Sequence, residues 1–301
     1  MVVTCPLCRA PGAAPAHAGV RDLEHGLPTR SSFSTCAACG LVFQDPQPEL
    51  SDLLSYYPAD YRPHVSGSSD GLLGFLKSLQ SQQLVSRYQR WLAADKGAAI
   101  LDLGCGSGQF LKALRRRGYT NLTGADRNPA LASYFEGTGI QFLRVDLEPD
   151  FQLEGRYQTI VMNYVLEHFL DPRHVLARCR EALVPGGQIL LLTPNADSIG
   201  HKLFAGFWSG LHAPRHPQIF TQGALRRLAC ELEFANVETA FVTDPASWAF
   251  SFQNWVRSHS EQQGPARGTA WYSLAGLPLW YTPALVEKLA GKSSSMVSSL
   301  R

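Results

Sequence analysis

The amino-acid sequence predicts an α/β protein: a doubly wound, mostly parallel sheet of seven strands, preceded by a small cysteine-containing module. Three observations predict this fold class. A buried-strand pattern runs into a glycine-rich turn and a helix at residues 100–114, further apolar segments follow at regular intervals and several of them end in an acidic residue, and two Cys-x-x-Cys pairs stand near the amino terminus. The chain has 301 residues, of which 45% are hydrophobic, so it can bury a full core and carry one small additional module.

The cysteine pairs predict a metal-bound module over residues 1–45. Cys5 and Cys8 are followed by Cys36 and Cys39 after 27 intervening residues, and this spacing suits four thiolates placed tetrahedrally around zinc. Paired disulfides are the alternative. We expect a cytoplasmic protein, because no secretory signal and no apolar run of roughly 20 residues is present, and disulfides are rare there. A purely structural zinc ribbon is favoured over one that covers the active site or binds a partner.

Residues 46–71 are predicted to form a connector. They are punctuated by prolines, carry the aromatic anchors Tyr56, Tyr57 and Tyr61, and end in a flexible break at Ser66–Gly71. The main domain is then expected over residues 72–301. It begins with apolar residues near helical spacing, which predict a helix beside the first strand: Leu76, Leu79, Val85, Tyr88, Trp91 and Leu92.

The segment after this helix predicts a cofactor loop. Residues 100–103 have a buried-strand pattern, and glycines at three alternate positions let the backbone turn sharply and approach a ligand: Gly104, Gly106 and Gly108. Asp102 stands at the end of the strand. A carboxylate there is unfavourable for a pyrophosphate and compatible with a cationic ligand.

Four further strands are predicted in order, at Asn121–Asp126, Ile140–Asp146, Tyr157–Asn163 and Leu183–Thr193. Together with the glycine loop, these segments resemble the class I S-adenosylmethionine-dependent methyltransferases, a Rossmann-like family. The resemblance implies that the glycines and Cys105 form the cofactor loop, that Asp126 holds the ribose and that Asp146 lies near the adenine. Asp102 would orient the loop or meet the amino-acid end of the cofactor, and Asn163 is assigned to the same site.

Two histidines are candidate bases for methyl transfer. The sulfonium of S-adenosylmethionine already has a good leaving group, so an oxygen or carbon acceptor needs only alignment and removal of a proton. His168 and Glu167 follow the fourth strand, at the methyl-transfer face of the family. This region also resembles ubiquinone-biosynthesis O-methyltransferases, some of which bind a divalent ion through Glu-x-x-Glu-His. Tyr164 replaces the first acid here, and the two remaining adjacent residues predict no catalytic metal.

Residues 208–221 contain the second candidate base, His216. The segment resembles the W…PRH…F(T/S) region of methyltransferases encoded with sugar, polysaccharide and natural-product pathways. Thr221 is predicted to cap the helix that follows, while His216 and Arg215 stand on a loop that can line a substrate pocket. Arg215 is also suited to pinning this loop.

The carboxyl-terminal part is expected to add a sixth strand at Val237–Thr243 and a seventh at Lys292–Leu300. Between them, residues 244–290 form an insertion with many aromatic side chains, which are Trp248, Phe250, Phe252, Trp255, Trp271, Tyr272, Trp280 and Tyr281. A buried pair of accessory helices is favoured. A substrate lid, a homodimer contact and a peripheral membrane contact are the alternatives.

These features predict an enzyme that transfers a methyl group to a small molecule, with oxygen of a sugar-like or natural-product acceptor favoured and carbon left open. An RNA methyltransferase and a non-catalytic cofactor-binding scaffold or regulator are the rivals. Nucleic acid is disfavoured as a partner, because 27 basic and 25 acidic residues leave a net charge of only +2 and no basic residues alternate with aromatics in the ribbon. Asn163 is not followed by Pro-Pro-Tyr, which disfavours methylation of a nucleobase amine.

Overall fold

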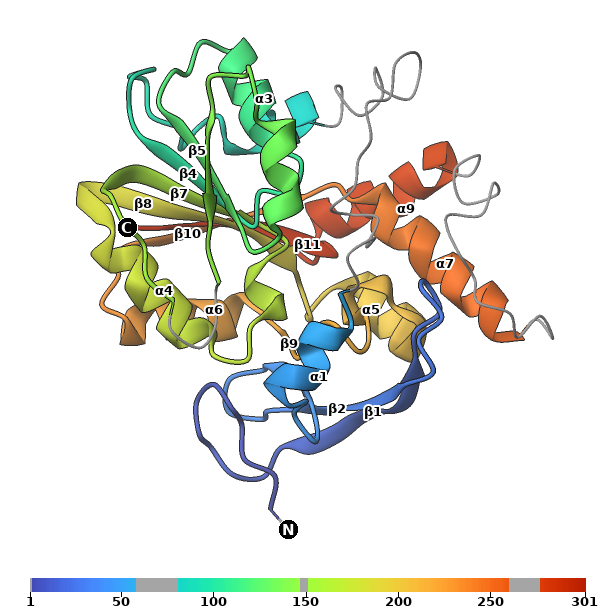
Figure 1. Cartoon of the computed structure of the whole chain (residues 1–301). Coiled ribbons are helices and arrows are strands. Elements are labelled where there is room, and N and C mark those ends of the chain that lie inside the picture. Colours follow the sequence, from blue (N-terminus) through green and yellow to red (C-terminus); the bar gives the residue numbers. More distant parts are fainter. Residues whose placement is uncertain (1, 58–80, 147–150, 260–276) are drawn as a thin grey trace.

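A computed structural model describes residues 2–57, 81–146, 151–259 and 277–301 of the chain (Figure 1). Its main sheet has the strand order β10-β11-β8-β7-β4-β5-β6. Five neighbouring strands are parallel, and β11 runs antiparallel to both of its neighbours. This confirms the predicted doubly wound sheet, whose strands are β4 (Ile100–Leu103), β5 (Leu122–Asp126), β6 (Gln141–Arg144), β7 (Tyr157–Asn163), β8 (Leu183–Pro194), β10 (Val237–Val242) and β11 (Ser295–Leu300).

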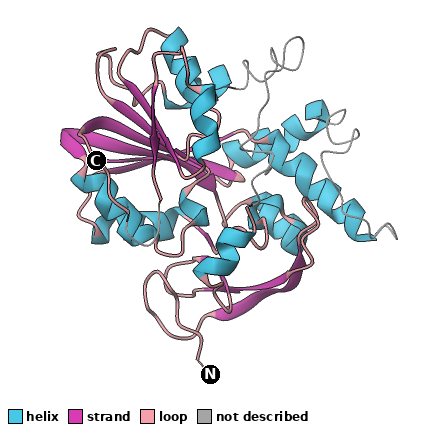
Figure 2. Ribbon diagram, in the orientation of Figure 1, coloured by secondary structure: helices cyan, strands magenta, loops and turns pink. Residues whose placement is uncertain are grey.

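Both faces of the sheet are buried. Successive side chains along a strand point to opposite faces, so each strand contributes to both cores. In β8, Ile189 and Leu191 join one hydrophobic cluster, whereas Leu190 and Leu192 join the other. Helices α4 (Pro172–Glu181) and α6 (Gln222–Glu231) cover the first face, and α3 (Gln109–Arg116) packs on the second (Figure 2). The side chain of Thr221 accepts a hydrogen bond from the backbone of α6, as predicted for its N-cap.

The helix predicted before the first strand is present in its described part. Residues 81–88 are helical, and Val85, Tyr88 and Trp91 pack in the same cluster as Ile100. Leu76 and Leu79 lie outside the described residues. The predicted connector contains a helix, α1 (Leu50–Ser55), and its Ser66–Gly71 break also falls outside the described residues.

The amino-terminal module forms a second sheet that the main domain completes. Strands β1 (Ala14–Arg21), β2 (Arg30–Thr35) and β3 (Val42–Gln44) are antiparallel, and β3 pairs with β9 (Gln218–Ile219) from the loop region after β8. The module shares one hydrophobic core with α6 and the residue before its N-cap. The module contributes Cys5, Leu7, Leu41 and Phe43, and the other side contributes Phe220 and Leu225. The boundary predicted at residue 45 therefore separates segments that pack as one body.

The aromatic insertion forms two helices, α7 (Pro245–His259) and α9 (Leu277–Leu289), which pack against each other. The rings of Phe252 and Trp280 lie 5.1 Å apart, so the expected accessory helix pair is present. It is only partly buried, because large side chains such as Trp255, Leu279 and Tyr281 are exposed. Trp271 and Tyr272 lie outside the described residues. Short helices complete the fold: α5 (Ile199–Phe204), η1 (Pro129–Tyr134), η2 (Leu166–His168), η3 (Ala205–Phe207) and η4 (Ser209–Leu211). Among the described residues, no helix has the length and apolar character needed to span a bilayer.

Candidate active site

A cavity of about 720 Å³ opens at the carboxyl ends of β4, β5 and β7, where doubly wound sheets bind ligands. One end is lined by the glycine loop and the acidic residues that follow the strands. The other end is lined by histidines and by side chains from the amino-terminal module and α1. The main lining residues are Glu24, Leu50, Leu53, Tyr57, Asp102, Gly104, Cys105, Gly106, Ser107, Asp126, Asp146, Asn163, His168, His212, His216, Asp244 and Phe250.

Two glycines in the loop after β4 are required by their close contacts. Gly104 has a φ of +72°, and a Cβ there would lie 2.5 Å from the Cγ2 atom of Val165. Gly108 has the same φ, and a Cβ there would meet the ring of Phe135 at 2.7 Å. Gly104 and Gly106 line the cavity, whereas Gly108 does not. Gly108 instead begins α3 as its N-cap.

The predicted ribose ligand, Asp126, holds the loop in this structure. It is buried at the end of β5, and its Oδ2 atom accepts a hydrogen bond from the backbone N–H of Gly106 at 3.1 Å. Its Oδ1 atom accepts from the N–H of Asn128 at 3.0 Å. The carboxylate therefore connects the end of β5 to the glycine loop at the wall of the cavity.

Asp102 is buried beside Asp126, with only 2% of its surface exposed. Burial, with a contribution from the charge of Asp126, raises the pKa of Asp102 to about 8, although the amide of Asn163 donates a hydrogen bond to it at 3.3 Å. Asn163 in turn accepts a hydrogen bond from the hydroxyl of Tyr88 at 2.7 Å. Tyr88 and Asn163 thus fix one side of this carboxyl group.

Asp146 and Cys105 have different surroundings at the same end of the cavity. Asp146 follows β6, is exposed, and pairs with Arg144 at 3.4 Å. Cys105 is buried in the loop, and this burial raises the pKa of its thiol. Cys105 is therefore a neutral packing group that also lines the cavity.

His168 and His216, the two predicted bases, come together at the other end of the cavity with their rings 4.5 Å apart. The Nδ1 atom of His168 lies 2.5 Å from the hydroxyl of Tyr57 and 3.1 Å from the carbonyl oxygen of Arg215. The Nδ1 atom of His216 lies 2.9 Å from the carbonyl oxygen of Gly210. A carbonyl next to Nδ1 favours the tautomer with the proton on that nitrogen, which leaves Nε2 able to accept a proton.

Sequence comparisons identify the family. A family model described as a methyltransferase domain matches residues 76–239, which is more than half of the chain. The chain belongs to this family, and it is an S-adenosylmethionine-dependent methyltransferase.

Its curated relatives include ubiquinone biosynthesis O-methyltransferases. The one from Cereibacter sphaeroides strain ATCC 17025 is 33% identical over 190 residues, which cover 58% of this chain and 76% of the relative. The one from Pseudomonas aeruginosa strain UCBPP-PA14 is 31% identical over 108 residues, covering 34% of this chain and 46% of the relative. The chain thus spans slightly less than half of the length of several of the relatives it matches.

Solved structures share the fold. Haemonchus contortus phosphoethanolamine N-methyltransferase 2, in complex with S-adenosyl-L-methionine, has a TM-score of 0.50 and 14% identity, covering 76% of this chain and 56% of that one. A chain of the Haloferax volcanii complex between the Trm112 methyltransferase activator and a methyltransferase has a TM-score of 0.51 and 15% identity, covering 75% of this chain and 92% of that one.

In this methyltransferase, the buried side chain of Arg215 stabilises the wall of the cavity. Its guanidinium pairs with Asp22 at 2.9 Å, and both side chains are only 1% exposed. It also donates a hydrogen bond to the carbonyl oxygen of Tyr56. This network favours the loop-pinning role expected for Arg215.

The cavity also contains residues that are not among the catalytic and cofactor-binding candidates predicted from the sequence. Glu24 comes from the turn after β1, Tyr57 from the end of the α1 region and His212 from the loop after η4. Tyr164, directly after β7, has a φ of +56°, unusual for a residue other than glycine, and its hydroxyl donates to Ser295 at 3.0 Å. Only long-range packing brings these residues together. The positive φ of Tyr164 had no signal in the sequence.

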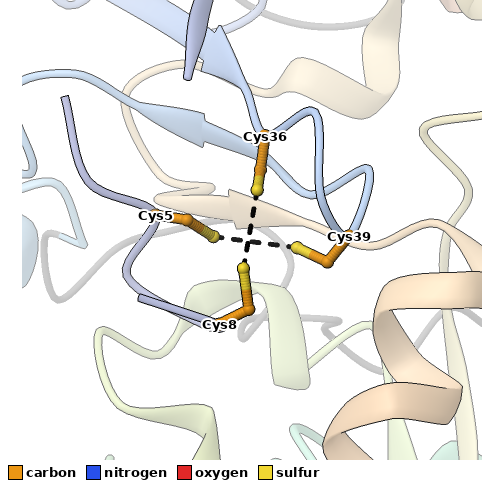
Figure 3. A group of neighbouring side chains, drawn as sticks. All are labelled: Cys5, Cys8, Cys36 and Cys39. Atoms are coloured by element: carbon orange, nitrogen blue, oxygen red, sulfur yellow. Dashed lines mark hydrogen bonds between the residues drawn. The ribbon is translucent and has the colours of Figure 1, made fainter. Parts of the chain in front are cut away.

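The four amino-terminal cysteines converge as predicted (Figure 3). The Sγ atoms of Cys5 and Cys39 are 3.7 Å apart, those of Cys8 and Cys36 are 3.5 Å apart, and all four thiols are free. A tetrahedral zinc site with Zn–S bonds of about 2.3 Å has edges of about 3.8 Å, which is close to these two distances. All four sulfurs lie within 4.8 Å of one another. None of the four lines the cavity.

Glu167 and His168 have a third neighbour that the sequence did not reveal. Ligand atoms of Glu167, His168 and His216 lie within 4.8 Å of one another. We expect no catalytic metal from the sequence because only two adjacent residues, Glu167 and His168, are available there as ligands. In the structure, a separate loop adds His216 as a third potential ligand. Glu167 itself is fully buried and accepts a hydrogen bond from Thr193 at 3.1 Å.

Proposed function

We propose that this methyltransferase transfers a methyl group to a hydroxyl oxygen of a small molecule, with a sugar-like or natural-product acceptor. The observation that carries the proposal is the continuity of the cavity from the glycine loop to His168. A cofactor on the loop and an acceptor beside the histidine would then share one cavity, which alignment for in-line attack requires.

The cofactor would occupy the end of the cavity with the acidic residues. Asp126 would receive the ribose hydroxyls, and Asp146 would lie near the adenine. Asp102, supported by Asn163, would meet the ammonium group of the amino-acid end, since a cationic group favours the ionised form of a buried carboxyl. Gly104 and Gly106 would let the backbone approach the cofactor, while Cys105 and Gly108 would keep the loop in shape.

The proposed reaction needs one proton acceptor, which is His168. Its Nε2 atom would take the proton of the acceptor hydroxyl while the oxygen attacks the methyl carbon of the sulfonium. The bond between that carbon and sulfur breaks, and its electron pair stays on sulfur as a neutral thioether. Tyr57 and the Arg215 carbonyl would orient the His168 ring through Nδ1. Burial lowers the pKa of His216 well below its ordinary value, so His216 would remain a neutral hydrogen-bond partner.

The lining of the acceptor end supports a small oxygenated molecule. Leu50, Leu53 and Phe250 give an apolar wall, whereas Tyr57 and the histidines supply polar groups at a few positions. Such a mixture is typical of small-molecule pockets. Two curated relatives are named as O-methyltransferases, which supports oxygen as the acceptor atom.

We further propose that Cys5, Cys8, Cys36 and Cys39 bind structural zinc. The spacing of their sulfurs supports zinc binding, and none of the four is among the cavity-lining residues. A folding role is favoured, because a segment of this size has few apolar residues of its own to bury.

Label transfer from methyl-labelled S-adenosylmethionine into fractionated metabolites and RNA tests the proposed function. We expect label in a small-molecule fraction and, in the product, a methyl group on oxygen. His168→Gln should lower kcat by about 100-fold or more and leave the cofactor Kd within about twofold, because it removes a general base. His259→Gln, at an exposed position on α7, is the matched control.

Three results would reject the proposal. Label in RNA with steep salt dependence would indicate an RNA methyltransferase. A methyl group found on carbon in the product would show that the acceptor atom is carbon and not oxygen. Wild-type turnover in His168→Gln would remove this histidine as the base.

A further inference from the structure

A second group of potential ligands lies in the wall of the acceptor end. Ligand atoms of Glu24, His25 and His212 lie within 4.8 Å of one another. Glu24 and His25 belong to the turn between β1 and β2, whereas His212 follows η4. The rings of His25 and His212 are nearly parallel, with an interplanar angle of 9° and centroids 5.7 Å apart. Two segments that are far apart in the sequence thus bring two imidazoles and a carboxyl group together.

The turn that carries Glu24 and His25 is firmly positioned. The Asp22 carboxylate accepts hydrogen bonds from the backbone N–H groups of Glu24 at 3.1 Å and of His25 at 2.8 Å. The same carboxylate forms the buried ion pair with Arg215 on the loop beyond His212. Because one carboxylate joins the two segments, the three ligand side chains are held near one another before any ion binds.

Further contacts constrain the ligand side chains. His212 has a φ of +35°, a conformation that residues other than glycine rarely adopt. Asn254 on α7 donates a hydrogen bond to Oε1 of Glu24 at 3.4 Å and so supports the carboxyl group from outside the turn.

We propose that Glu24, His25 and His212 bind a divalent first-row metal ion at the wall of the acceptor cavity. Two imidazoles and one carboxylate suit Mn²⁺, Fe²⁺, Co²⁺ or Zn²⁺, and three protein ligands leave coordination positions open. Glu24 and His212 line the cavity, so an ion bound by this group would lie at the cavity wall.

A bound ion would favour one chemical class of acceptor. This inference about the acceptor rests on the proposed function. An acceptor with two adjacent oxygen atoms can chelate the ion through its open positions. Coordination lowers the pKa of a bound hydroxyl, so the oxygen is more readily deprotonated near neutral pH. We therefore expect vicinal diols or catechol-like hydroxyls to be better acceptors than isolated hydroxyls.

Mn²⁺ is the most selective probe of this site. Thiolates bind Mn²⁺ poorly compared with zinc, so the zinc-loaded cysteine site should not take it up. Titration of the zinc-loaded full chain, followed by the electron paramagnetic resonance signal of free Mn²⁺, should show one bound equivalent. Glu24→Gln and His212→Gln should each weaken this binding at least tenfold, and both variants should retain the wild-type Kd for S-adenosylmethionine. Glu136→Gln and His259→Gln, at exposed positions, are the matched controls.

The pulsed resonance spectrum of bound Mn²⁺ supplies a test that needs no variant, since it should show nitrogen coupling from two imidazoles. Absence of a bound equivalent, absence of nitrogen coupling, or unchanged affinity in Glu24→Gln would overturn the proposal. Loss of Mn²⁺ binding in His216→Gln, with binding retained in Glu24→Gln, would also overturn it, because the ion would then lie at Glu167, His168 and His216. Binding is measured without acceptor, so a failed methyl-transfer assay leaves this result intact and is recognised separately.

Discussion

Asp102 is a buried carboxyl group whose ionisation should be linked to cofactor binding. Its pKa of about 8 leaves it neutral in the free protein below that pH. A cationic ammonium placed beside it would favour the ionised form, so binding below pH 8 should release up to one proton. The affinity for S-adenosylmethionine should then rise by up to about tenfold per pH unit as the pH increases from 6 to 8. Calorimetry in buffers of different ionisation enthalpy measures both quantities.

Asp102→Asn is the matched variant for this prediction, because it keeps the size of the side chain and removes its charge. Its affinity should not change with pH in this range, and no proton should be released. The same raised pKa makes the contribution of Asp102 to the free energy of unfolding fall as the pH rises from about 4 to about 8, since the unfolded chain ionises first. Identical proton release in wild type and variant would disprove this role.

Strand β9 is the element that connects the cysteine module to the catalytic domain. It pairs with β3 through Val42 and Ile219, and Thr221 donates a hydrogen bond to the carbonyl oxygen of Cys39 at 3.3 Å. The loop that carries His212 and His216 immediately precedes this strand. Folding of the module and placement of the histidines are therefore coupled through this strand pair, together with the Asp22–Arg215 ion pair and the shared core.

Removal of zinc tests this coupling. Chelation of the metal, or Cys8→Ser, should lower the Tm by about 10 °C or more and reduce acceptor turnover at least tenfold, because the proposed site supplies folding free energy to β1, β2 and β3. The Kd for S-adenosylmethionine should change less, since the glycine loop belongs to β4 and α3. Cys230→Ser, at an exposed cysteine, is the control. Unchanged turnover after complete zinc loss would contradict the coupling.

At the scale of the whole molecule, the sequence predicts the main sheet well and the second sheet poorly. The central parts of β7 and β8, residues 160–162 and 189–192, are continuous apolar runs, which is typical of strands buried on both faces, and glycine spacing marks the loop after β4. The two residues of β9, Gln218 and Ile219, have no such pattern. Their strand conformation depends on a partner more than 170 residues away, which local propensity does not encode.

Some residues of the candidate site could likewise be predicted from the sequence, and others could not. Asp126, His168 and the cysteines carry local signals, either a position after a strand or a fixed spacing. Glu24 and Tyr57 enter the cavity only because the amino-terminal module packs on the main domain. Gly108 stays a predicted part of the cofactor loop, and the sequence gives no sign that the Phe135 ring, which a Cβ at this position would meet, also requires a glycine here.

A crystal structure of the chain with S-adenosylhomocysteine tests the central claim, that one cavity brings together the cofactor and His168, the proposed base. We predict ribose hydroxyls at the Asp126 carboxylate, the amino group beside Asp102, and the sulfur directed along the cavity toward His168, with room for an acceptor hydroxyl between them. A nucleoside bound outside this cavity, or a sulfur directed away from His168, would contradict the account.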